Sequence, residues 1–90
     1  MRVSSRTGFE EVLCDYERLI RLDERMDVLF DCDMAGEIEI KNFYENVEIL
    51  VEKYIPDYDI GDRYPDKSYE KALILYSVLQ NYLKDKIRNF

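Results

Sequence analysis

Apolar residues recur at helical spacing in three segments of this chain. The segments run from about Phe9 to Phe30, from about Ile38 to Ile55 and from about Ser68 to Arg88. In each of them the apolar side chains follow an i, i+3, i+4 pattern, which places them on one face of an α-helix. The pattern therefore predicts an all-α fold with three helices.

Polar residues and prolines mark where these helices begin and end. Thr7 and Glu10 form a capping-box pair ahead of the first helix. Pro56 ends the second helix, because proline cannot continue the hydrogen-bond ladder. Asp66 or Ser68 is a suitable N-cap for the third helix. Near its other end, where the helix dipole favours cations, stand Lys84, Lys86 and Arg88.

The connections between the segments limit the architecture. One is short, roughly Cys32 to Gly36, and the other is longer, roughly Pro56 to Pro65. Short connections favour antiparallel packing of neighbouring helices. We expect a three-helix bundle, or a helical hairpin with a third helix packed on it. Residues 1–8 are expected to form a short flexible arm, and residues 9–90 a single helical domain.

The third segment carries more apolar residues than one helix face can hold. From Leu73 to Leu79 the helix would be apolar on nearly every side. Such a helix is normally buried, and two partner helices in a 90-residue chain can hardly cover it. The pattern predicts a homo-oligomer whose interface includes Leu75, Val78 and Tyr82.

Composition argues against several functional classes. The chain has no His and no Trp, and its three glycines are scattered. The commonest general base is therefore missing, and a glycine-rich phosphate loop is excluded, so we expect no enzyme and no cofactor. Two cysteines without histidine fall short of the four ligands of a structural zinc site.

The cysteines and the lack of long apolar runs indicate a compartment. Cys14 and Cys32 would lie about 27 Å apart along one helix, whereas bridged Cα atoms lie within about 7 Å of each other. Reduced thiols fit a reducing compartment. No stretch is apolar enough for a signal peptide or a membrane span. We expect a cytoplasmic protein without membrane contact, in the host cytoplasm if it is viral.

Charge is distributed unevenly along the chain. Residues 7–62 hold seventeen Asp and Glu against five Lys and Arg, a net charge of −12, whereas residues 63–90 carry +3. Acids at i, i+4 or i, i+3 spacing without matching cations repel one another, so such columns suggest a basic partner. The loop after the second helix adds tyrosines, which are enriched among binding hot spots. The candidate partner-binding residues are Asp23, Asp27, Asp31, Glu45, Glu48, Glu52, Asp57, Tyr58, Asp59, Asp62 and Tyr64.

One short segment has the spacing of a known metal site. In Asp31–Asn42, Asp occupies positions 1 and 3, Gly position 6, Ile position 8 and Glu position 9. This segment resembles the twelve-residue calcium loop of EF-hand proteins, in which Ca²⁺ takes carboxylate and carbonyl oxygens. The resemblance implies ligands from Asp31, Asp33, Glu37 and Glu39. Position 5 is Ala35 and position 12 is Asn42, so two expected ligands are missing. We expect no binding at micromolar Ca²⁺.

Together these observations predict a non-enzymatic, acidic helical binding protein that antagonises or neutralises a basic, possibly nucleic-acid-binding, partner protein. In size, charge and helicity it is comparable with small phage-encoded inhibitors, nucleic-acid mimics and immunity proteins. Direct contact with nucleic acid is disfavoured by the net charge of −7. The alternatives are a degenerate, EF-hand-like calcium-responsive module and a structural or assembly subunit.

Overall fold

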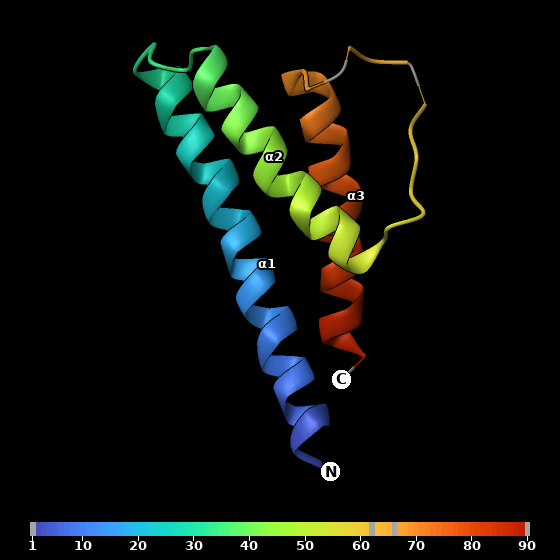
Figure 1. Ribbon diagram of the computed structural model, residues 1–90. Coiled ribbons are helices and arrows are strands. Elements are labelled where there is room, and N and C mark those ends of the chain that lie inside the picture. Colours follow the sequence, from blue (N-terminus) through green and yellow to red (C-terminus); the bar gives the residue numbers. More distant parts are fainter. Residues whose placement is uncertain (1, 62, 66, 90) are drawn as a thin grey trace.

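Three helices form the body of the protein, as the apolar pattern predicts. The computed structural model describes residues 2–61, 63–65 and 67–89, and their side chains from residue 8 onward. No strand occurs within these described ranges. The helices are α1 (Arg2–Asp31), α2 (Glu37–Tyr54) and α3 (Tyr69–Arg88) (Figure 1).

Helix α1 begins earlier than its apolar stripe. Its backbone is helical from Arg2, seven residues ahead of the expected start at Phe9, so the expected arm of residues 1–8 is helical from Arg2 onward. Thr7 and Glu10 lie inside the helix and not at its start. Apolar spacing marks where a helix packs and does not mark where its backbone begins; residues 2–8 contain no proline that would prevent a helix.

A tight turn joins α1 to α2. Asp33 adopts a left-handed conformation with φ 59°. The Met34 N–H donates to the Leu29 carbonyl at 2.7 Å, and the Asp33 N–H donates to the Phe30 carbonyl at 3.1 Å. These two bonds form a Schellman motif with Asp33 as its left-handed residue, which ends α1 after Asp31. Gly36 is the N-cap of α2, and its N–H donates to the Glu39 carboxylate at 3.0 Å.

The second connection reverses the expected direction of α3. Helices α2 and α3 run in the same direction, and both run opposite to α1 (Figure 1). The antiparallel arrangement predicted for α2 and α3 is therefore wrong. The fourteen residues between them can span about 46 Å when extended, whereas α2 is about 27 Å long. This length lets the chain return to the start of α2 before α3 begins. Ser68 caps α3 by accepting the Lys71 N–H at 3.2 Å.

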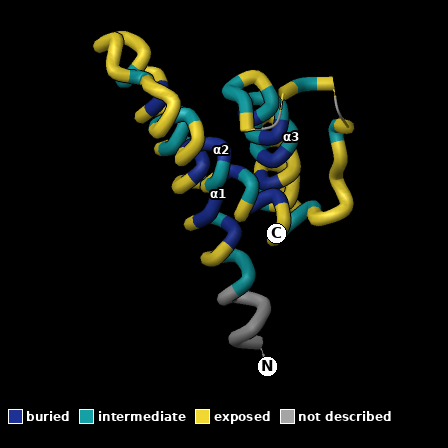
Figure 2. The backbone as a smooth tube through the Cα atoms, turned by 45° about the horizontal axis from the view of Figure 1, so that its top comes forward, coloured by how far each residue is buried: buried dark blue, intermediate teal, exposed yellow. Residues whose placement is uncertain are grey.

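The core lies where the three helices face one another. Figure 2 shows the buried residues along these inner faces and a mostly exposed long connection. Helix α3 packs against both α1 and α2, so its apolar run is largely covered within one chain. The buried apolar residues are Val12, Leu19, Met26, Phe43, Tyr44, Val47, Leu50, Val51, Ala72, Leu75, Leu79 and Leu83.

Candidate protein-binding surface

The predicted partner-binding residues come from three parts of the chain. One group lies on α1, a second on α2 and a third in the long connection. The connection follows the side of α2 and α3 that is remote from α1 (Figure 1). Asp62 lies outside the described residues.

The acidic column on α1 borders helix α3. Asp23 is half-buried, and burial together with the neighbouring carboxylates of Asp27 and Glu24 raises its pKa. Burial, followed by the charge of Asp23, raises the pKa of Tyr76 to about 12. The charges of this column therefore reach the tyrosines of α3. Asp27 and Asp31 at the upper end of the column are exposed.

The acidic column on α2 has a cation that sequence spacing does not reveal. The Glu45 carboxylate lies 3.6 Å from the Lys67 ammonium in the long connection. Both side chains are more than 40% exposed, so this pair contributes little to stability. Glu48 is half-buried and Glu52 is exposed.

The long connection is shaped by two local turns. The Tyr58 N–H donates to the Ile55 carbonyl at 3.0 Å, with Pro56 at the second position of this turn, where its fixed φ is favourable. The Asp59 carboxylate accepts the Gly61 N–H at 2.8 Å, and Gly61 has φ 73°, a conformation that glycine adopts without strain. These turns leave Asp59 exposed.

A groove forms where this connection meets α3. Its volume is about 420 Å³, within the range of about 300–1,000 Å³ that is common for ligand pockets. The first turn of the connection and α3 both line it, so Asp57 and Tyr58 from the predicted partner-binding set meet Val78 and Tyr82 from the predicted oligomer interface. Tyr64 is half-buried and does not line the groove. We call this the tyrosine groove, lined by Tyr54, Ile55, Pro56, Asp57, Tyr58, Val78 and Tyr82.

Two aromatic rings of the tyrosine groove already hold cations from the same chain. Lys53 Nζ lies 5.3 Å from the centre of the Tyr54 ring, and Lys86 Nζ lies 5.9 Å from the centre of the Tyr82 ring. The two rings are themselves 6.3 Å apart. Ammonium groups at this distance are attracted to the negative face of an aromatic ring. These two rings are therefore already in contact with lysines of the chain itself.

A buried ionic contact beside the groove was missed by sequence reasoning. Asp15 of α1 is buried, and it accepts hydrogen bonds from Lys53 Nζ at 2.7 Å and from the Tyr54 hydroxyl at 2.5 Å. Lys53 also forms an ion pair with Glu11. We call this set the Asp15 joint, because it ties α1 to the last turn of α2. The sequence indicates this contact in one way only: Asp15 occupies a position on the apolar face of the helix, between Val12 and Leu19 at helical spacing.

The joint shifts the pKa values of its members. Burial pushes the pKa of Asp15 upward, but hydrogen bonds from Lys53 and Tyr54 outweigh this effect and hold it below its usual range. Hydrogen bonds to Asp15 and Glu11 raise the pKa of Lys53. Burial, followed by the hydrogen bond to Asp15, raises the pKa of Tyr54. All three shifts favour a carboxylate, an ammonium and a neutral phenol at neutral pH.

The three residues expected at an oligomer interface differ in exposure. Leu75 is 6% exposed and belongs to the core of a single chain, so it offers almost no surface to a second chain. Val78 is half-buried, whereas Tyr82 is 37% exposed. Leu75 was expected on the outside because the sequence does not show that α3 packs against two helices at once.

The calcium-loop alternative does not have the required backbone. Asp31 is the last residue of α1 and helix α2 begins at Glu37, the seventh position of the twelve-residue segment, so more than half of the segment is helical. The Glu39 carboxylate is already bonded to the Gly36 N–H. Among the residues that the structure describes, no group of three or more His, Cys, Asp and Glu side chains could hold a metal ion. Asp31, Asp33, Glu37 and Glu39 are therefore not brought together as ligands.

Comparisons with known proteins were made at three levels. No protein-family model, curated protein or solved structure matches this chain. Within the described residues, no helix is long and apolar enough to span a membrane. The functional argument therefore rests on the geometry and electrostatics of the chain itself.

Proposed function

We propose that this protein is a non-enzymatic binding module that antagonises or neutralises a basic partner protein, and that a cationic side chain of the partner enters the tyrosine groove. The observation that carries the proposal is the meeting of Asp57 and Tyr58 with Val78 and Tyr82 in one groove. Apolar contacts with a few well-placed polar groups are typical of binding sites. A carboxylate beside tyrosine rings suits Lys or Arg.

The acidic columns have a separate role in this proposal. They lie outside the groove, so they act on the approach of the partner and not on its final contacts. Long-range attraction between a net charge of −12 in residues 7–62 and a basic protein increases the association rate, and salt weakens it. Buried aromatic anchors instead determine how slowly a complex dissociates.

Site-specific photo-cross-linking tests the location of the interface. A photoreactive phenylalanine derivative replaces Tyr58 in one version of the full chain and Ser77 in another. Ser77 is exposed on α3 and does not line the groove. In the cells that produce the protein, we expect position 58 to capture a basic protein and position 77 to capture none. Equal capture at both positions, or capture of acidic proteins only, would refute the proposal.

The oligomeric state provides a second test, because a second copy could occupy the same groove. Light scattering at tens of micromolar reports whether the chain self-associates. A dimer that Tyr82→Ala converts to monomer would show that the groove is an interface between copies, which contradicts the proposal. A wild-type monomer, or a dimer that Tyr82→Ala leaves intact, keeps the groove available to a basic partner.

A further inference from the structure

A second surface, of opposite charge, lies between α1 and α2. Arg18, Arg21 and Arg25 follow one side of α1 within about 10 Å along the helix axis. Among the described side chains, none of these arginines lies within 4 Å of a carboxylate. Arg18 is close enough to lower the pKa of Asp15, but Asp15 is already bonded to Lys53 and Tyr54. The guanidinium groups are therefore available to an external anion.

The arginines border two neighbouring hollows. One hollow of about 320 Å³ lies along α1 at Cys14, Glu17 and the three arginines. A second hollow of about 200 Å³ lies between α1 and α2, and both are lined by Leu22 and Arg25. Because they share these two residues, the hollows are neighbours on the surface. We call the two hollows together the arginine trough.

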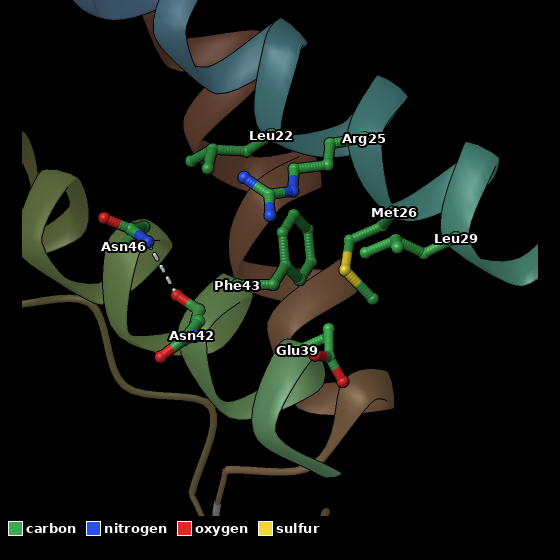
Figure 3. A pocket seen from close by; sticks show the side chains of 8 residues that line it. All are labelled: Leu22, Arg25, Met26, Leu29, Glu39, Asn42, Phe43 and Asn46. Carbon is green, nitrogen blue, oxygen red and sulfur yellow. Dashed lines mark hydrogen bonds between the residues drawn. The ribbon is translucent and has the colours of Figure 1, made fainter. Parts of the chain in front are cut away.

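The part of the arginine trough between the helices has an apolar floor and a polar rim. Figure 3 shows the Arg25 side chain extending towards Phe43, with Asn42 and Asn46 on the opposite side. Met26 and Phe43 are buried. Asn46 donates to the Asn42 backbone carbonyl at 2.8 Å, and no hydrogen bond of the Asn42 side-chain amide occurs among the described residues. The rim therefore offers guanidinium and amide donors above an apolar surface.

We propose that the arginine trough binds an acidic amphipathic helix of a second protein. Carboxylates one helical turn apart match the spacing of the arginines, and an apolar residue between them fits beside Leu22 and Leu29, the half-buried apolar side chains of the lining. Arginine forms bidentate bonds with carboxylates, which gives such a contact its directionality. This site lies on the α1–α2 side of the molecule and is independent of the tyrosine groove.

Nucleic acid is a less suitable occupant for the same surface. Glu17 and Glu39 also line the arginine trough, and the net charge of the chain is −7. An acidic peptide meets this repulsion too, but a phosphate backbone carries a charge at every nucleotide and offers no apolar group for the floor. An acidic peptide contributes both the charge and the apolar side chain.

A designed peptide tests the proposal. The probe is a fluorescein-labelled fifteen-residue helical peptide of Leu and Glu with carboxylates at i, i+4 and i+7, and its control has Gln for every Glu. We expect fluorescence anisotropy to show salt-sensitive binding of the Glu peptide and at least about tenfold weaker binding of the Gln peptide. Equal binding of the two peptides, or no binding of the Glu peptide, would overturn the proposal.

Matched variants of the full chain locate the binding site. Arg21→Gln with Arg25→Gln should lower the affinity for the Glu peptide at least about tenfold. Arg63→Gln with Arg88→Gln changes two exposed arginines outside the trough and should leave this affinity within about twofold of the wild-type value. Tyr58→Ala should also leave this binding unchanged, which separates it from the proposed function. Equal losses in the two arginine pairs would refute the location.

Two further outcomes would identify a different occupant. The first is a fifteen-nucleotide single-stranded DNA that binds more tightly than the Glu peptide and loses affinity in the variant with Arg21→Gln and Arg25→Gln. That result would refute the acidic helix as the occupant and identify nucleic acid instead. Self-association of the chain that the same variant abolishes would identify a second copy as the occupant. Circular dichroism of each variant verifies that the helices are retained.

Discussion

The Asp15 joint and the tyrosine groove use the same residue types, share Tyr54, and differ in burial. In the joint, Asp15 is 6% exposed and receives hydrogen bonds from Lys53 and Tyr54. In the groove, Asp57 and Tyr58 are exposed. A buried carboxylate that accepts hydrogen bonds from a second helix holds the two helices together, whereas an exposed one beside an aromatic ring is available to a partner. Burial therefore separates a structural pair from a candidate binding pair.

Removing the buried carboxylate should have the largest effect. We expect Asp15→Ala to lower the free energy of unfolding by about 3 kcal/mol, because two charge-assisted bonds are lost and the Tyr54 hydroxyl is left without its acceptor. Asp57→Ala should change it by less than about 0.5 kcal/mol. Urea unfolding monitored by circular dichroism measures both. Similar values for the two variants would remove the distinction between joint and groove.

The pH dependence of stability should identify the Asp15 joint. The pKa of Asp15 is lowered in the fold, so its contribution is present above the unfolded pKa of about 3.9 and is lost as the pH falls through the folded value. The stability difference between wild type and Asp15→Asn should therefore shrink between pH 5 and pH 2. Denaturant unfolding at several pH values tests this, and a constant difference would be inconsistent with it.

Tyr54 and Lys53 determine how stability depends on pH in the alkaline range. Both pKa values are raised in the fold, so their contribution is fully present below the unfolded pKa values, near 10, and is lost as the pH rises towards the folded ones. Stability should thus decline above about pH 10. Tyr54→Phe should reduce this decline, because the phenol is then absent.

Asp23→Asn should increase stability slightly. Burial, followed by repulsion from Asp27 and Glu24, raises the pKa of Asp23, so its ionised form costs stability at neutral pH, and the cost disappears below its unfolded pKa. We expect a gain of several tenths of a kcal/mol, about the size of one like-charge pair. A loss of stability in thermal unfolding at pH 7 would show that the carboxylate supports the fold.

Lys67→Ala should have the smallest effect. Its ion pair with Glu45 is exposed, and such pairs contribute less than about 1 kcal/mol. We expect a change in the free energy of unfolding below about 0.5 kcal/mol, and none in 0.5 M salt, where screening acts over only a few ångströms. A change above 2 kcal/mol would mean that Lys67 fixes the long connection.

The sequence predicts most of the fold and little of the site, for physical reasons. Helices follow from local periodicity, which explains why the observed ends of α2 and α3 lie within one residue of the predicted ones. The direction of α3 depends on where a fourteen-residue connection runs, which periodicity does not encode. Leu75 was assigned to the surface for the same reason.

Candidate binding residues depend on contacts between distant parts of the chain. The ion pair of Glu45 with Lys67, the bonds of Asp15 to α2, and the meeting of Tyr58 with Tyr82 all join positions far apart in sequence. Charge spacing along one helix identified the acidic columns, but it could not distinguish a paired acid from an unpaired one.

The central claim is that the exposed tyrosine of the groove serves binding, not folding. Calorimetric titration of the captured basic partner into wild type and Tyr58→Ala, with urea unfolding of both proteins, tests it most directly. We predict a loss of about 2 kcal/mol in binding, roughly thirtyfold in Kd, with the free energy of unfolding unchanged within about 0.5 kcal/mol. Unchanged affinity, or a loss of unfolding free energy as large as the loss in binding, would contradict the claim.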